Sequence, residues 1–144
     1  MPIGDSEENG MPPAIASILE HPTTFIVARV VLTTLFWSEV IFGTLKFRGF
    51  VAAVERVSLP FPTFVAAATI VYQLIGSALI ITNYDQLGWL GAAMLAVFTL
   101  LTIPYGHAFW KFEEPRRTQE FHFVLEHITV VGGLLLVAIL LTRA

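Results

Sequence analysis

Residues 61–109 read FPTFVAAATIVYQLIGSALIITNYDQLGWLGAAMLAVFTLLTIPYGHAF, and this stretch decides the class of the fold. Two long apolar runs flank the short polar stretch Asn83-Tyr84-Asp85-Gln86. Each run is close to the roughly 20 residues that a helix needs to cross about 30 Å of hydrocarbon. A short connection makes consecutive helices antiparallel neighbours. The stretch therefore predicts two adjacent membrane-spanning helices, at about 61–82 and 87–109.

Outward from this stretch, two further apolar runs lie at about 23–45 and 121–142. The sequence thus predicts an all-α fold, a polytopic membrane four-helix bundle over residues 23–144. Residues 1–22 contain acidic side chains and prolines but no Lys or Arg, which indicates a flexible acidic tail and not a signal peptide. Residues 46–59 have the pattern of an amphipathic segment in the interface, and residues 111–120 that of a solvated loop.

Composition supports a membrane protein and excludes several other classes. The 144 residues are 56% hydrophobic and 13% charged, with a mean hydropathy of +0.75, whereas a soluble domain carries about 25% charged residues. A net charge of −3 lacks the positive field used in nucleic-acid binding. The chain has no cysteine, so disulfides, thiolate metal sites and cysteine nucleophiles are excluded.

The positions of the cationic residues predict an orientation. The first and third connections between the predicted helices hold most of them, and the opposite side has only Arg143. By the positive-inside rule these two connections are cytoplasmic, so both termini are predicted to be extracytoplasmic. The six residues are Lys46, Arg48, Arg56, Lys111, Arg116 and Arg117.

Polar residues within the predicted spans are the candidates for function, because a charge at the bilayer centre costs at least about 2.5–3.5 kcal/mol. At about 1.5 Å per residue, the acids and imidazoles of three helices fall in the same, cytoplasmic half of the membrane, and Gln73 lies near the middle. We therefore expect a polar cluster that binds a cofactor or other ligand. Its members are Glu39, Gln73, His107, Glu126 and His127.

Three interpretations of this cluster remain open from the residues alone. In the first, the side chains tie helices together. In the second, they hold a quinone headgroup or relay protons. In the third, they ligate a metal or a haem, the haem through His107 with His122 or His127. The metal interpretation is the weaker one, because adjacent residues such as Glu126 and His127 point about 100° apart on a helix. We assign no metal ligand. Arg29, on the first helix, is expected to snorkel outward or to pair with a carboxylate or lipid phosphate.

At these residues the sequence resembles the DoxX family of small four-helix bacterial membrane proteins. The similarity is carried by short landmarks in a characteristic order. They are Ala28-Arg29, Leu35-Phe36-Trp37-Ser38, Lys46-Phe47, Leu59-Pro60-Phe61-Pro62, His107-Ala108-Phe109-Trp110 and Val131-Gly132-Gly133-Leu134-Leu135.

The chain departs from the family pattern at its polar positions. Glu39 follows Ser38 where the family has glycine, Gln73 replaces a glutamate, and Glu126-His127 stands where Lys-Asn is common. The family resembles a membrane subunit of a thiosulfate:quinone oxidoreductase, and its members are linked to redox and oxidative-stress assemblies.

The resemblance implies an accessory or quinone-interacting subunit of a membrane redox system in the bacterial inner membrane. At most, the chain is one subunit of a membrane oxidoreductase. Its expected partners are the lipid bilayer and other membrane subunits or further copies of itself, and not nucleic acid. The alternative is a non-catalytic scaffold or assembly partner. A small proton-coupled transporter is a further alternative that four short helices disfavour.

Overall fold

The computed structural model describes residues 10–143, all of whose regular structure is helical. The prediction of an all-α fold is therefore confirmed. The α-helices are α1 Pro13–Leu19, α2 Pro22–Leu32, α3 Thr34–Leu45, α4 Phe47–Arg56, α5 Pro62–Thr82, α6 Gly88–Gly106 and α7 Arg116–Leu141, with short 3-10 helices η1 Tyr84–Gln86 and η2 Phe109–Lys111.

Three of these helices are long and apolar enough to cross a membrane, namely α5, α6 together with η2, and α7. A fourth span is obtained if α1 and α2, bent by 59° at residues 20–21, are counted as one. The described chain is thus a multi-span membrane protein with three to four candidate spans. The prediction of a first span at 23–45 is not reproduced as one helix, because α2 and α3 divide it at Thr33.

Side-chain hydrogen bonds explain the division at Thr33. The Thr33 hydroxyl donates to the carbonyl of Arg29 at 2.8 Å, and the Thr34 hydroxyl and the Trp37 Nε1–H both donate to the carbonyl of Val30 at 3.2 Å. Such local bonds compete with the helical ladder and satisfy the carbonyls that the break leaves free. Hydropathy does not detect a break of this kind.

Two other predicted segments are corrected by the structure. Residues 111–120 are not a loop throughout, because α7 begins at Arg116, five residues before the predicted start at Phe121. Residues 13–19, within the predicted flexible tail, form α1. The part of that tail at residues 1–9 lies outside the described residues. The amphipathic segment predicted at 46–59 is the helix α4, with Val54 buried.

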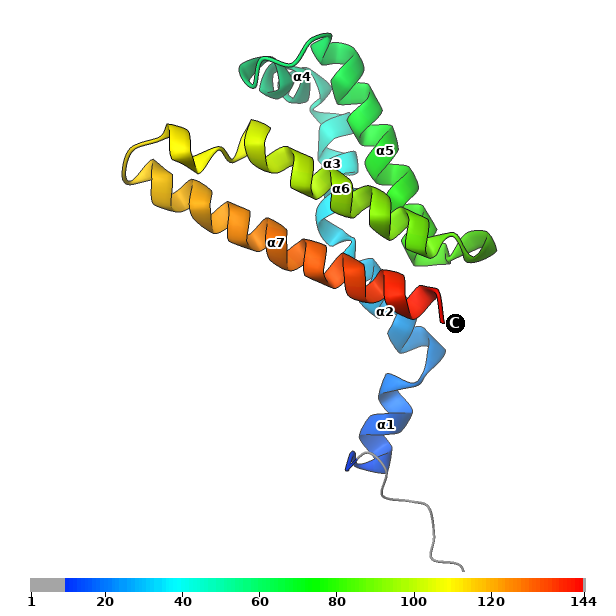
Figure 1. The fold of residues 1–144 in the computed structure, drawn as a ribbon. Coiled ribbons are helices and arrows are strands. Elements are labelled where there is room, and N and C mark those ends of the chain that lie inside the picture. Colours follow the sequence, from blue (N-terminus) through cyan, green and yellow to red (C-terminus); the bar gives the residue numbers. More distant parts are fainter. Residues whose placement is uncertain (1–9, 144) are drawn as a thin grey trace, which may run out of the picture.

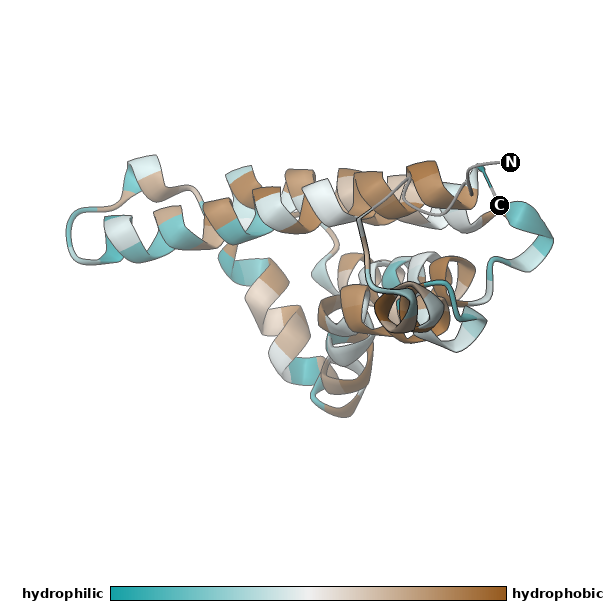
Figure 2. Ribbon diagram, turned by 90° about the horizontal axis from the view of Figure 1, so that it is seen from below, coloured by the Kyte–Doolittle hydropathy of each residue, from teal (hydrophilic) through white to brown (hydrophobic). Residues whose placement is uncertain are grey.

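The helices form two arms that meet at one end (Figure 1). One arm is the pair α6 and α7, which run side by side, and the other holds α3, α4 and α5. The α5–α6 turn joins the arms, and from there α5 and α6 diverge. Figure 2 shows that apolar residues follow the helices, whereas hydrophilic residues gather at the connections.

The core lies where the arms meet. Ile80 of α5, Leu95 of α6 and Leu134 of α7 are completely buried together with Phe36 of α3. Here α5 and α6 approach closely, since a Cβ on Gly91 would lie 2.6 Å from the carbonyl oxygen of Gly76. Small residues of this kind let backbones come together in a membrane, where apolar faces gain nothing by leaving lipid.

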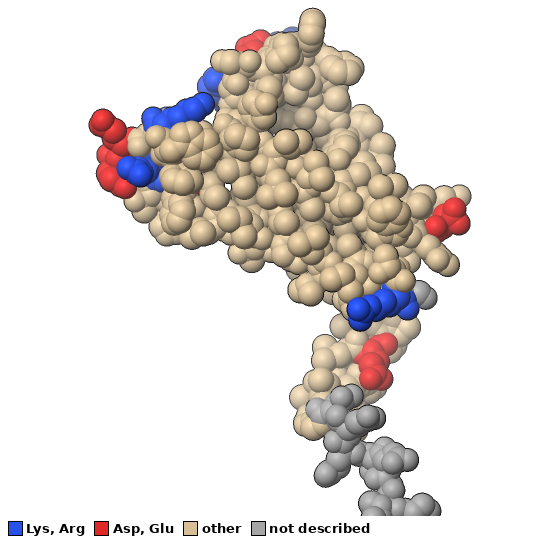
Figure 3. Space-filling view, in the orientation of Figure 1, with Lys and Arg blue, Asp and Glu red and all other residues tan. Residues whose placement is uncertain are grey.

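On the face that Figure 3 shows, the charged side chains lie at the outer ends of the arms, at the end where the arms meet and near the chain termini, and a broad uncharged surface separates them. Arg29, Glu39 and Glu126 lie within the helices instead. An α-helix rises 1.5 Å per residue, so the 26 residues of α7 are longer than about 30 Å of hydrocarbon requires. Its first turn, with Arg116 and Arg117, therefore extends to the polar interface.

Candidate functional site

A cavity of about 880 Å³ lies between the two arms. Its wall is built from α3, α4, α5, α6 and α7, and most of the lining is apolar, with residues such as Leu35, Phe98 and Val130. Pockets for small organic ligands have volumes of about 300–1,000 Å³ and a few convergent polar groups on an apolar lining. The cavity meets this description.

All five residues that the sequence singles out line this cavity. Glu39 comes from α3, Gln73 from α5, His107 from the residue that ends α6, and Glu126 and His127 from α7. The depth argument placed four of them at one level without knowing how the helices pack. The structure brings all five together, and their binding of a ligand remains a prediction.

Two polar residues of the cavity wall are buried, Thr99, whose hydroxyl donates to the carbonyl of Leu95, and Gln73. Gln73 is 3% exposed, and its Oε1 atom has no hydrogen-bond partner. Leaving such a group unpaired costs about 1–3 kcal/mol. Ser77, one turn along α5, also has an unpartnered hydroxyl oxygen, but it does not line the cavity. Gln73 therefore borders the cavity, whereas its Oε1 atom is buried and makes no hydrogen bond.

His127 presents one free ring nitrogen. Its Nδ1 lies 2.7 Å from the carbonyl oxygen of Phe123, one turn earlier on α7. A carbonyl only accepts, so the imidazole carries its proton on Nδ1. In the neutral ring, Nε2 is then an acceptor with its lone pair available. The ring is half-buried in the cavity wall.

His107 is held by a carboxylate that the sequence analysis missed. Its Nδ1 lies 2.9 Å from Oε2 of Glu120, and Oε1 of the same carboxylate lies 3.4 Å from Nε of Arg116. The His107 ring also contacts His127, with 4.7 Å between ring centroids. Glu120 and Arg116 thus position one imidazole of a contacting pair at the rim of the cavity.

The signal for Glu120 was present but lay outside the predicted helix. Glu120 and His127 are seven residues apart and so lie on one face of a continuous helix. The predicted start at Phe121 placed Glu120 in a loop, which removed this relation. Had the helix been extended to Arg116, Glu120 would have joined the candidate set.

The geometry argues against the haem interpretation. The contacting rings of His107 and His127 leave no space for a porphyrin between them. His122 is exposed, donates from Nδ1 to the carbonyl of Thr118 at 2.8 Å, and does not line the cavity. Within residues 10–143, no group of three or more His, Asp and Glu side chains is arranged to hold a metal ion.

Arg29 takes a partner that the sequence analysis did not consider. Its guanidinium donates to the carbonyl of Ile80 on α5 at 3.2 Å and lies 4.9 Å from the centre of the Phe25 ring. Within residues 10–143 its partners are backbone carbonyls and not a carboxylate, and outward snorkelling or pairing with a lipid phosphate stays a prediction. Arg29 links α2 to α5 near the core and is not part of the cavity lining.

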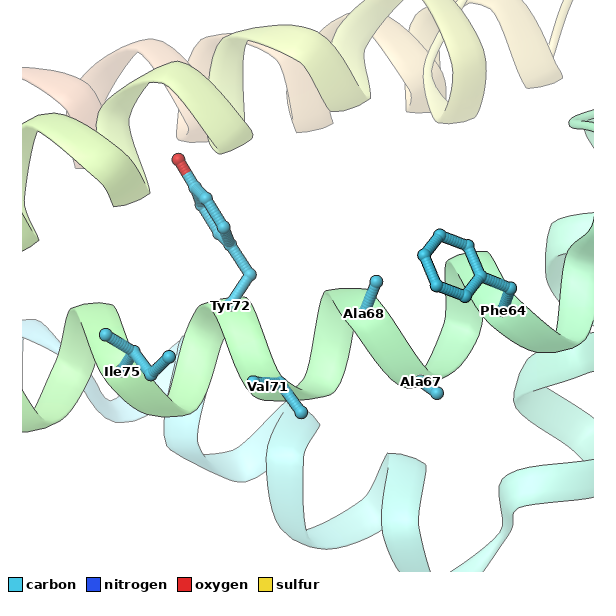
Figure 4. A pocket seen from close by; sticks show the side chains of 6 residues that line it. All are labelled: Phe64, Ala67, Ala68, Val71, Tyr72 and Ile75. Atoms are coloured by element: carbon cyan, nitrogen blue, oxygen red, sulfur yellow. The ribbon is translucent and has the colours of Figure 1, made fainter.

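A second hollow, of about 410 Å³, lies on the outer face of α5 (Figure 4). It is lined only by α5, and Tyr72 is the only lining side chain with a polar group. The Tyr72 hydroxyl points toward α6 and donates to the carbonyl of Met94 at 3.1 Å. The hollow therefore offers an apolar surface with no free side-chain donor, unlike the cavity between the arms.

The comparisons with known proteins agree with the resemblance found in the sequence. Residues 24–108 match the DoxX family. No curated protein and no solved structure gives a significant match. The matched residues include Glu39, Gln73 and His107, whereas Glu126, His127 and the Val131–Leu135 landmark lie beyond them. Because the match covers more than half of the chain, this multi-span membrane protein belongs to the DoxX family.

Proposed function

We propose that this protein is an accessory, quinone-interacting subunit of a membrane redox system in the bacterial inner membrane. The observation that carries the proposal is the largely apolar cavity of about 880 Å³ between the arms, on which polar side chains from widely separated parts of the chain converge. They are Glu39, Gln73, His107, Glu126 and His127. An apolar cavity with a few convergent polar groups is typical of a site for a small organic ligand.

A quinone fits the chemistry of this cavity. Its ring and tail are apolar and suit walls formed by Leu35, Phe98 and Val130, and its oxygens need a few hydrogen-bonding groups. The Gln73 amide N–H groups and the Thr69 hydroxyl would donate to the headgroup oxygens, and the rings of His107 and His127 would border it. Quinones also reside in the bilayer, from which a multi-span protein can take them up.

The redox role requires a partner. A bound quinone would supply the electron-accepting chemistry, while the residues of this chain bind and orient it. The described residues contain no cysteine and no cluster of metal-ligating side chains that would carry electrons. We therefore place the chain as one subunit beside an electron-transferring protein, and not as an oxidoreductase on its own.

Binding of a short-chain quinone analogue to the purified protein in lipid nanodiscs tests the proposal. His127→Ala is expected to weaken binding several-fold, because it removes an imidazole ring that lines the cavity and would pack against the bound ring. His122→Ala is the matched control, because His122 lies on the same helix and makes the same bond to the carbonyl four residues earlier. Equal loss in both variants, or no binding by the wild type, would refute the proposal.

A non-catalytic scaffold is the second candidate. The bonds from Arg29 to Ile80 and from His107 to Glu120 tie separate helices together, which is what a structural use of polar residues requires. This alternative expects co-purification with a larger complex and cavity variants that lose stability without any change in ligand binding. Comparison of thermal unfolding with quinone binding for each variant separates the two candidates.

The orientation is proposed with both termini extracytoplasmic, supported by the cationic residues of α4 and of the α6–α7 connection. The cysteine-free chain allows a direct test with single cysteines. Glu113→Cys should react with an impermeant thiol reagent only after the cytoplasmic side is opened, whereas Asp85→Cys should react in intact cells. The reverse pattern would invert the orientation.

A further inference from the structure

We infer that His107 is a hydrogen-bond donor for a carbonyl oxygen of the ligand in the cavity between the arms, and that it becomes this donor by taking up one proton. The inference rests on the proposed function and assigns one ligand contact to a residue and to its protonation state. It comes from the two imidazoles on the cavity wall, which contact each other but have different partners.

Both imidazoles have one ring nitrogen engaged and the other free. Nδ1 of His107 lies 2.9 Å from Oε2 of Glu120, and Nδ1 of His127 lies 2.7 Å from the carbonyl oxygen of Phe123. Among residues 10–143, neither Nε2 atom has a hydrogen-bond partner, and neither is buried. Because both rings line the cavity, the Nε2 atoms are the polar ring atoms left for a ligand.

The protonation state of a ring decides what its Nε2 offers to that ligand. A neutral imidazole with its proton on Nδ1 has only a lone pair at Nε2, whereas an imidazolium has an N–H donor at both nitrogens. The oxygens of a quinone accept hydrogen bonds. A neutral ring therefore borders a quinone without a hydrogen bond, and a protonated ring donates one to it.

The two rings are too close for both to be charged. Their centroids are 4.7 Å apart, and like charges at this distance repel strongly where water is partly excluded. The contacting pair therefore holds one proton beyond its neutral state.

Two features assign that proton to His107. Its partner is the carboxylate of Glu120, which is stabilised in its ionised form by an N–H on each oxygen, whereas the partner of His127 is a neutral carbonyl. His107 also ends α6, where the free carbonyls of a helix favour a cation, and His127 lies within α7. Arg116 competes for Glu120 only weakly, because its Nε is 3.4 Å away and its side chain is 63% exposed.

The other titratable groups of this region have no direct bond to His107. They are Glu39 of α3, Tyr105 of α6, Lys111 of η2 and Glu126 of α7, and within the described residues none of them forms a hydrogen bond or ion pair with the His107 ring. The part of the cavity lining that comes from α4 and α5 contains no charged side chain. All four groups remain in the variants below, so any pH effect of their own survives there.

The affinity for a short-chain quinone analogue, measured against pH in lipid nanodiscs, tests the inference. Between about pH 8 and about pH 5.5, a range that spans the usual imidazole pKa of about 6.5, the affinity of the wild type should rise. We expect a rise of about tenfold, the gain of one hydrogen bond from a charged donor. Glu114→Gln, which removes a carboxylate bound to Thr118, should show the same rise.

Replacement of each ring identifies the residue. His107→Phe keeps a ring on the cavity wall without the nitrogens, so the rise should disappear, whereas His127→Phe keeps the ring contact with His107 and should retain it. Glu120→Gln still accepts the Nδ1 proton but has no charge, so most of the rise should be lost. A rise that survives in His107→Phe, or that disappears in His127→Phe, would overturn the inference.

Nitrogen-15 NMR of the histidines in the ligand-free protein tests the assignment without quinone binding, even if His107→Phe does not fold. As the pH falls over the same range, the His107 signals should become those of an imidazolium while those of His127 stay neutral. Protonation of His127 in place of His107 would overturn the inference. Quinone affinity independent of pH would also overturn it and leave the quinone site in place, whereas absence of binding at every pH would refute the proposed function itself.

Discussion

The two ends of α5 show how one helix serves two purposes. Near Gly76 and Ile80 it lies against α6 so closely that a single added Cβ would meet a backbone atom. Nearer its start, at Thr69 and Gln73, it borders a cavity of about 880 Å³. Close packing at one end fixes the divergence of the arms, and that divergence leaves the space that Thr69 and Gln73 border.

The largest loss of thermal stability is expected from a substitution where α5 and α6 pack closely. Gly91→Ala places a Cβ 2.6 Å from the carbonyl oxygen of Gly76, and backbone cannot yield as a flexible side chain does. Overpacking of this kind costs about 1–3 kcal/mol or more, so the melting temperature in detergent should fall sharply. Gly106→Ala, on the same helix but with open space around its Cβ, should melt like the wild type. Equal melting of both variants would show that the close approach is not required.

The next largest effect is a gain in thermal stability, expected from a substitution at the cavity end of α5. Gln73→Met removes a buried acceptor without a partner, whose burial costs about 1–3 kcal/mol. The variant should therefore be more stable than the wild type to thermal unfolding. A less stable variant would mean that the Gln73 carboxamide already has its partner.

A smaller loss of stability is expected from a substitution at the rim of the cavity. Glu120→Ala removes the carboxylate that holds His107 Nδ1 at 2.9 Å. Because both side chains are partly exposed, with 25% for His107 and 13% for Glu120, we expect a loss of about 1 kcal/mol or less in stability. Ligand affinity should fall more than stability, since His107 loses its fixed position. Glu114→Ala, which removes a carboxylate bound only to Thr118, is the control for a change of charge.

Hydropathy predicted the long spans well for a physical reason. The run at 61–82 is largely apolar and carries no charged residue, so the observed helix Pro62–Thr82 differs from the prediction by one residue. The start of α7 was missed because residues 116–120 are polar, although they continue the same helix. The break at Thr33 depends on hydroxyl and indole bonds to two carbonyls, which no average over a window can reveal.

The candidate site was predicted in part for a related reason. The rise per residue and the direction of each helix placed Glu39, His107, Glu126 and His127 at a common depth, and the structure puts them on one cavity. Depth does not give the rotation of a helix or the state of a hydrogen bond. The unpaired oxygen of Gln73 and the role of Glu120 therefore required coordinates.

Photoaffinity labelling with a quinone analogue that carries a photoreactive group tests the central claim most directly. After irradiation in nanodiscs and mass spectrometry of the fragments, we expect label on the cavity side of α5 and α7, near Gln73 and His127, and its loss when unmodified quinone competes. The hollow on the outer face of α5, at Val71 and Ile75, serves as the internal control. Label concentrated there, or spread over the apolar surface and unaffected by competition, would contradict a quinone site between the arms.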